Sequence, residues 1–251
     1  MTVDEVRYER RGAAALVTID RQHRRNAIDG KTSDALVAAL DSFEADDEAR
    51  VMVLTGAGEA FCAGADLTAI ETLEPRLRLG EGPLGFTRRV ATKPTIAAID
   101  GWAVAGGLEL AVWCDIRVAS ERSQFGCLER RFGVPLIDGG TWRLPRIVGF
   151  GRAMDLVLTG RLVASAEALS IGLVTAVVDD PIAHALGMAE QLAAYPQETM
   201  LSDRRSMYDG YGHPLGEALD IEAAYGREVL LVGHAGAQRF AQGEGRGATG
   251  V

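Results

Sequence analysis

One carboxylate stands inside an apolar, glycine-containing stretch at residues 101–114. The neighbours of Glu109 there are small or hydrophobic, so folding must either bury the carboxylate or turn it toward a cavity. Gly106 and Gly107 precede it, and glycines ahead of a helix-like run let a ligand approach the backbone while the first amides stay free to donate. A carboxylate about one helical turn from free backbone donors is suited to chemistry on an acyl group.

Small residues form a second candidate site at residues 55–67, where a strand-like run leads into a loop. Asp66 stands where the N-cap or first turn of the next helix is expected, and free amides at a helix start favour negative charge. The pair Gly56 and Gly58 after a strand also suggests a dinucleotide-binding fingerprint. That alternative fails because Phe61 occupies the third glycine position and no acidic residue closes a second strand about 20 residues later.

A second glutamate stands beside two arginines within residues 124–141. Taken alone, Glu129 next to Arg130 and Arg131 is typical of a surface or structural ion pair, in contrast to the apolar surroundings of Glu109. Arginines also cluster earlier in the chain, at positions 21, 24 and 25. That cluster is compatible with a solvated face or with anion binding, and the pattern does not decide between them.

The composition is that of an ordinary globular enzyme, with 251 residues, 47% hydrophobic and 24% charged. The net charge of −9 and the lack of a basic stripe argue against a nucleic-acid partner. Three cysteines form no CxxC pair, so a disulfide framework is not expected. Four histidines are scattered without the spacing of metal ligands, so no metal site is expected.

The first residues of the chain are acidic and contain no apolar segment of the kind found in secretory signals. No apolar run approaches the roughly 20 residues that a membrane-spanning helix needs. We therefore expect a cytoplasmic protein without a membrane partner.

Hydrophobic patterning predicts an α/β fold. Five valine- and isoleucine-rich runs predict strands, at residues 14–19, 51–55, 95–99, 116–119 and 173–178. Five segments predict helices, at residues 29–43 with Asp29 as N-cap, 152–159, 165–171, 182–194 and 215–232. Strands concentrate before Ala119 and helices after Phe150, which favours an α/β core followed by a helical C-terminal part over two independent domains.

Two segments have the composition of irregular structure. Residues 71–85 mix charges with proline and glycine and predict a mobile loop or frayed helix over a site. Residues 242–251 are glycine-rich, and we expect them to be disordered.

Together these segments resemble the crotonase (enoyl-CoA hydratase/isomerase) superfamily, over residues 14–237. The resemblance lies in four motifs that follow one another in the family's order, at residues 26–28, 61–67, 101–115 and 139–144. It implies a crotonase-like ββα superhelix core in residues 1–195 and a helical C-terminal trimerisation region in residues 196–251. The partner it implies is a second copy of the chain, in a homotrimer or a dimer of trimers.

The resemblance also implies roles for particular residues. The amides of Ala65 and Gly106 would form an oxyanion hole for the thioester oxygen of an acyl-CoA. Glu109 and Glu129 fall on the positions of the two catalytic glutamates of family hydratases, which reverses the interpretation of Glu129 as a surface residue. Glu109 would deprotonate the attacking water and Glu129 would protonate Cα.

Binding of coenzyme A is also implied by the resemblance, and no cofactor is implied beyond the CoA of the substrate itself. The residues expected to contact the CoA thioester are Arg24, Ala27, Ala63, Ala65, Asp66, Leu67 and Gly106.

The sequence departs from well-studied hydratases after Glu129, where it has Arg130 and Arg131, and at Thr68, where many members have lysine. Asp138 lies near the sequence position where some family isomerases have an additional acid, but not in the same register. The alternative interpretation is that Asp138 is a loop residue that caps the following helix. The leading hypothesis is therefore a 2-enoyl-CoA hydratase that forms 3-hydroxyacyl-CoA. The alternatives are an enoyl-CoA isomerase or acyl-CoA hydrolase of the same fold, or a non-catalytic acyl-CoA-binding protein.

Overall fold

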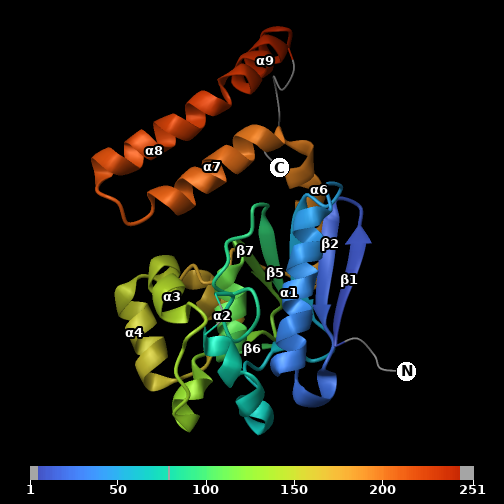
Figure 1. Ribbon diagram of the computed structural model, residues 1–251, viewed down its shortest axis with the longest axis vertical. Helices are drawn as coiled ribbons and strands as arrows, with labels where there is room; N and C mark the ends of the chain where they lie inside the picture. Colours follow the sequence, from blue (N-terminus) through green and yellow to red (C-terminus); the bar gives the residue numbers. More distant parts are fainter. Residues whose placement is uncertain (1–4, 79, 244–251) are drawn as a thin grey trace. The chain divides into compact units, whose positions relative to one another are not determined.

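The computed structural model describes residues 5–78 and 80–243 (Figure 1). The chain forms two compact units, residues 1–192 and residues 193–251. Among the described residues, the strands lie in the first unit, in two sheets, and the second unit is helical. Residues 244–251, most of the tail predicted to be disordered, lie outside the described residues, as do residues 1–4 at the other end.

The larger sheet has six strands in the order β1-β2-β3-β5-β7-β10. Its strands are β1 (Val6–Arg11), β2 (Ala14–Ile19), β3 (Val51–Gly56), β5 (Thr95–Ile99), β7 (Ile116–Ala119) and β10 (Ala176–Val177). Only β1 runs antiparallel to its neighbour, and the other described pairings are parallel. The strand predicted at 173–178 is shortened, because the amides of Leu173 and Val174 bond back to the carbonyl of Ala168 and close a helix instead.

Every residue of β2, β3 and β5 is buried, because the sheet is covered on both faces. One face of the sheet packs against Leu36, Leu40 and Phe43 of helix α1 (Gly30–Ala45). The opposite face packs against Ala185 and Ala189 of helix α6 (Pro181–Ala194). The continuous apolar runs in the sequence thus correspond to doubly covered strands, as predicted.

The second sheet has four short strands in the order β4-β6-β8-β9. These are β4 (Ala60–Cys62), β6 (Trp102–Val104), β8 (Gln124–Gly126) and β9 (Val163–Ala164). β4, β6 and β8 are parallel, and β9 is antiparallel to β8. Runs of two or three residues carry no period-2 signal, so the sequence did not predict this sheet. It is nevertheless the sheet whose strands end beside the residues proposed from the sequence, such as Ala65 after β4 and Gly106 after β6.

Six α-helices begin in the first unit, together with four 3₁₀ segments within the described residues. The helices are α1 (Gly30–Ala45), α2 (Gly106–Trp113), α3 (Gly140–Val148), α4 (Phe150–Thr159), α5 (Ser165–Ser170) and α6 (Pro181–Ala194). Asp29 caps α1 as predicted, since its carboxylate accepts the Thr32 amide at 2.9 Å. The 3₁₀ segments are η1 (Gln22–Arg24), η2 (Leu67–Thr72), η3 (Glu74–Arg78) and η4 (Leu128–Phe132). Two of these, η2 and η3, extend into the predicted loop at 71–85 and occupy residues 71–72 and 74–78 of it.

The second unit consists of α7 (Gln197–Gly210), α8 (Leu215–Glu228) and α9 (Leu230–Ala241). α7 packs along α8, and α9 contacts both. The single helix predicted at 215–232 is therefore wrong, because Val229 leaves the helical region with φ −108° and ψ 11° and separates α8 from α9. Within residues 5–78 and 80–243, no helix is both long and apolar enough to cross a membrane.

Candidate active site

A cavity of about 610 Å³ opens in the first unit where the ends of β4 and β6 meet α2, η2, η3 and η4. Both candidate glutamates, Glu109 and Glu129, line it, together with the candidate amide residues Ala65 and Gly106. These four residues come from three separate stretches of the sequence, and the fold brings them to one space. A cavity of this size accommodates a small organic ligand.

Glu109 is 3% exposed and its carboxylate is held by the backbone of the α3 entry. Its Oε1 accepts the Asp138 amide at 2.9 Å and the Gly140 amide at 2.8 Å. Burial, together with the nearby Asp138 carboxylate, raises the pKa of Glu109, the two amides offset only part of this effect, and the resulting pKa is about 8. Glu109 is thus a fixed carboxyl group that takes up a proton near neutral pH, which is the property of a general base or acid.

Glu129 lies in the first turn of η4 and is 6% exposed, although Arg130 and Arg131 beside it are exposed. Within the part of the chain that the structure describes, neither of its buried carboxylate oxygens has a hydrogen-bond partner. Burial raises the pKa of Glu129, and the charge of Arg130 opposes this only in part. A buried carboxyl group that lines a cavity without protein donors is available to a ligand or water there.

Asp138 is a third buried acid in the lining, at 2% exposure. Its carboxylate accepts the Leu84 amide at 3.0 Å and the hydroxyl of Thr87. The prediction that it caps the next helix is wrong: Gly139 is the N-cap of α3 and no side chain caps that end. Because Thr87 and Leu84 hold the carboxylate, Asp138 contributes its amide to Glu109 and its negative charge to the raised pKa of Glu109.

The amides of Ala65 and Gly106 come from two loops in close contact. Gly64 has φ +93°, and a side chain there would place its Cβ 2.8 Å from the Gly106 nitrogen. Among the described residues, neither the Ala65 nor the Gly106 amide has a protein acceptor in the backbone or side-chain bonding. Two free amides from adjacent loops of one cavity can donate to a single oxygen atom.

Ala105 sets the direction of the Gly106 loop. It has φ +52° and ψ −128°, a conformation that costs a non-glycine residue on the order of 1–3 kcal/mol. Its own amide donates to the Gly126 carbonyl at 2.8 Å, and its carbonyl accepts the Leu108 amide at 2.9 Å. The surrounding hydrogen bonds therefore hold a strained turn at the point where α2 begins beside the cavity.

The residues predicted to contact the ligand divide into two groups. Ala63 and Leu67 line the cavity with Ala65 and Gly106. Arg24, Ala27 and Asp66 do not appear in its lining: Arg24 is exposed in η1, and the carboxylate of Asp66 is bonded to Arg21 and Thr68. The roles of all of them remain predictions.

Sequence reasoning did not identify several lining residues, which are Arg25, Ile70, Leu77, Leu84, Trp102 and Phe132. Four of these, Ile70, Leu77, Trp102 and Phe132, are large hydrophobic side chains that are exposed, Phe132 at 70%. The proline- and glycine-containing segment 71–85, predicted to lie over a site, was the one sequence signal for this part of the cavity lining.

No group of three histidine, cysteine or acidic side chains able to hold a metal ion occurs in residues 5–78 and 80–243.

Replacing Glu109 by Gln should stabilise the protein at alkaline pH. The folded state raises the pKa of Glu109 from 4.5 to about 8, so the folded protein binds the proton more tightly than the unfolded chain. Protonation of Glu109 therefore contributes on the order of several kcal/mol to the free energy of unfolding. This contribution is fully present below pH 4.5 and is lost as the pH rises through 8. The uncharged Gln lacks that loss. Denaturant unfolding of both proteins at pH 5 and pH 8.5 measures the effect, and an equal difference at both pH values would contradict the buried carboxylate.

Comparisons with known proteins agree in one family. A family model described as enoyl-CoA hydratase/isomerase matches residues 9–241. The chain is 37% identical over 232 residues to enoyl-CoA hydratase EchA19 of Mycobacterium tuberculosis, covering 89% of this chain and 87% of that protein. It is 40% identical over 184 residues to the short-chain-enoyl-CoA hydratase of Clostridium acetobutylicum, covering 71% and 70%. The solved structure of enoyl-CoA hydratase EchA1 from Mycobacterium marinum has a TM-score of 0.90 and 34% identity, and the match covers 96% of both chains.

Proposed function

This chain belongs to the enoyl-CoA hydratase/isomerase family, and from that premise we propose that it is an enoyl-CoA hydratase, a hydro-lyase. It adds water across the 2,3 double bond of an enoyl-CoA thioester and gives a 3-hydroxyacyl-CoA. The observation that supports this proposal most strongly is that two buried glutamates and two free amides line the same cavity.

In the proposed reaction, Glu109 and Glu129 position one water molecule between them. The Glu109 carboxylate takes a proton from the water while the oxygen of that water forms a bond to Cβ. The π electrons of the double bond then move onto the thioester oxygen. The amides of Ala65 and Gly106 stabilise that developing enolate, each by about 3–4 kcal/mol. Glu129 then delivers a proton to Cα, and the thioester carbonyl re-forms. The raised pKa of Glu109 makes it a stronger base than an exposed carboxylate.

The substrate-binding residues are part of the proposal. Ala63, Ala65, Leu67 and Gly106 contact the thioester end of the ligand, since they line the cavity. Arg24, exposed in η1, pairs with a phosphate of the CoA. Ala27 and Asp66 lie outside the cavity lining, and they support the residues that contact the ligand. The reaction needs no cofactor other than the CoA carried by the substrate.

The proposal extends to the assembly and the location of the protein. Residues 196–251 form the trimerisation region of a homotrimer or a dimer of trimers, and the enzyme acts in the cytoplasm. Apolar side chains of α8 and α9 that are exposed in the single chain, such as Leu219 and Leu231, support an interface with a second copy. Light scattering of the purified protein tests the trimer, and a mass equal to one chain would contradict it.

Decay of the enoyl-thioester absorbance tests the proposed function directly. The purified protein is mixed with crotonyl-CoA and with medium- and long-chain 2-enoyl-CoA substrates. We expect the absorbance to fall and a 3-hydroxyacyl-CoA to form. Release of free thiol without hydration would favour the hydrolase, and conversion of a 3-enoyl-CoA without hydration would favour the isomerase. No reaction with any chain length, despite binding, would favour a non-catalytic acyl-CoA-binding protein.

Replacing Gly64 by Ala should lower kcat about 100-fold or more, with a smaller change in KM. The added Cβ would lie 2.8 Å from the Gly106 nitrogen and 2.9 Å from the Ala105 Cβ, so the two loops must separate. A matched control is Gly149→Ala, since Gly149 also has a positive φ of +84° but nothing lies within 4 Å of a Cβ there. Equal kcat values for the two variants would sink the role assigned to these amides.

A further inference from the structure

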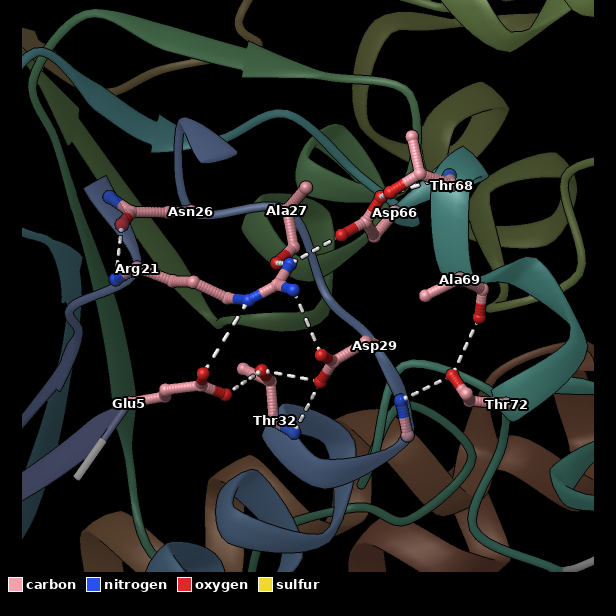
Figure 2. Close-up of polar contacts among 11 residues, drawn as sticks. Glu5, Arg21, Asn26, Ala27, Asp29, Thr32, Asp66, Thr68, Ala69 and Thr72 are labelled. Carbon is pink, nitrogen blue, oxygen red and sulfur yellow. Dashed lines mark hydrogen bonds and ion pairs between the residues drawn. The ribbon is translucent and has the colours of Figure 1, made fainter. Parts of the chain in front are cut away.

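Arg21 is a buried arginine just outside the cavity lining. It follows β2 directly and is only 8% exposed, whereas Arg24 of the same cluster is exposed. A buried guanidinium is costly unless carboxylates and carbonyls pair with it. The sequence allowed this arginine cluster to be either a solvated face or an anion-binding site. Arg21 fits neither alternative, because it is buried and paired with carboxylates of the protein itself. Figure 2 shows its guanidinium pointing inward among acidic side chains.

The guanidinium joins two chain segments that are distant in the sequence (Figure 2). Its Nη1 donates to Asp66 Oδ2 at 2.7 Å and to the Ala27 carbonyl at 3.0 Å. Its Nη2 pairs with Asp29 Oδ2 at 2.9 Å, and its Nε lies 3.7 Å from Glu5 Oε1. One planar side chain thus contacts residues 27 and 29 of one segment and residue 66 of the other.

These partners flank a backbone bridge between Ile28 and Ala65. The Ile28 amide donates to the Gly64 carbonyl at 2.7 Å, and the Asp66 amide donates to the Ile28 carbonyl at 2.8 Å. Ala65 lies between these two bonds, so its own amide faces the opposite side, where the residue lines the cavity. The direction of that amide therefore depends on the geometry of the bridge.

Hydrogen bonds to both carboxylate oxygens hold Asp66 in one orientation. While Oδ2 accepts from Arg21, Oδ1 accepts the Thr68 amide at 2.9 Å and the Thr68 hydroxyl at 2.7 Å, which starts η2. Burial alone raises the pKa of Asp66, but the hydrogen bonds from Thr68 and Arg21 outweigh it and lower the pKa to about 2. Asp66 is therefore ionised at neutral pH, and the pair with Arg21 is a charged one.

We propose that Arg21 is a positioning residue for the oxyanion hole, which aligns the Ala65 amide by clamping the segments on both sides of the Ile28–Ala65 bridge. The inference rests on the proposed function, because it assigns the Ala65 amide to the thioester oxygen. Arg21 touches neither the substrate nor the reacting atoms in this account. The guanidinium reaches Asp66 and the Ala27 carbonyl from Nη1 and Asp29 from Nη2, whereas a lysine offers all its donors from a single nitrogen and does not reproduce this planar fork.

Binding of an enolate tests the alignment separately from turnover. Acetoacetyl-CoA places negative charge on the thioester oxygen when it ionises, and its enolate absorbs in the near ultraviolet. Butyryl-CoA carries no such charge. In Arg21→Lys we expect kcat to fall about 10- to 100-fold with KM changed less than about threefold. Affinity for the enolate should fall by a similar factor, while affinity for butyryl-CoA stays within about twofold.

Two further variants keep the test informative if Arg21→Lys folds poorly. Asp66→Asn removes the charge and leaves one acceptor oxygen, so its NH2 group must face either Arg21 or the Thr68 amide, and we expect a loss of the same kind. The double variant should lose no more than Arg21→Lys alone, because both act through one contact. The matched control is Arg117→Lys, since Arg117 is another buried arginine that donates to backbone carbonyls, those of Cys114 at the C-terminal end of α2 and of Leu173 before β10, and it does not line the cavity. It should lower the melting temperature and leave kcat unchanged.

The outcomes separate the inference from the proposed function. If the wild type binds the enolate but Arg21→Lys and Asp66→Asn bind it equally well, Arg21 has no positioning role. If Arg117→Lys loses kcat and enolate affinity as Arg21→Lys does, the effect is one of general stability and the inference is wrong. If the wild type binds butyryl-CoA but shows no preference for the enolate, the oxyanion hole itself is misassigned and the proposed function fails with it.

Discussion

Glu109→Gln is expected to lower kcat for hydration of crotonyl-CoA by about 10³- to 10⁴-fold, with KM nearly unchanged. Gln matches the volume of Glu and can present its oxygen to the same two amides, those of Asp138 and Gly140. The substitution therefore keeps the geometry of the α3 entry and removes only the basic group. Steady-state kinetics over a range of pH values, with the protein concentration raised for the variant, measure the loss.

The stability of the same variant identifies the cause of its inactivity. A variant that is inactive but more stable than the wild type at pH 8.5 has lost a base, whereas one that is inactive and unstable has lost its fold. Glu190→Gln is the matched control, because Glu190 also accepts a backbone amide, that of Ala13 at 2.8 Å, but lies outside the cavity lining. It should retain full activity. A Glu109→Gln enzyme with at least a tenth of the wild-type kcat would remove Glu109 from the proposed mechanism.

The two glutamates show how far local sequence could predict this site. Glu109 lies in an apolar run, so its burial was readable from its neighbours. The amides that bind its carboxylate belong to residues 138 and 140, about thirty positions later, and no local pattern connects them to it. Glu129 is the opposite case: its charged neighbours predict a surface position, and the short turn of η4 places it inward while Arg130 and Arg131 stay outside. Only the family resemblance pointed to it.

The same distinction between local and long-range information applies to the fold. Strands buried on both faces, such as β2 and β5, have the lengths that their valine- and isoleucine-rich runs predict. The second sheet escaped prediction because each of its strands has at most three residues and gains its stability from pairing with distant segments. Arg21 is a similar case, since its acidic partners lie up to 45 residues away. The sequence thus contained the chemical groups, and the pairings that orient them are tertiary.

Glu129→Gln is expected to lower kcat for hydration by about 10²- to 10³-fold, because an amide cannot supply the proton that Cα takes up. The substitution should leave the fold intact, since among the described residues no hydrogen bond to the carboxylate of Glu129 is lost. Exchange of the Cα protons of butyryl-CoA in deuterated water adds a measurement that isolates this step. That exchange needs a base at Cα and the oxyanion hole, but no water at Cβ.

The exchange separates the two glutamates. Glu129→Gln should abolish the exchange at Cα, whereas Glu109→Gln should retain it within about tenfold while losing hydration, since the two proton transfers use different groups. Mass spectrometry of the recovered thioester measures both rates. If Glu129→Gln hydrates crotonyl-CoA at the wild-type rate, one carboxylate is sufficient and the isomerase or hydrolase alternative gains. If instead both variants lose both reactions equally, the two carboxyl groups share each proton transfer, and the division of roles between base and acid is wrong.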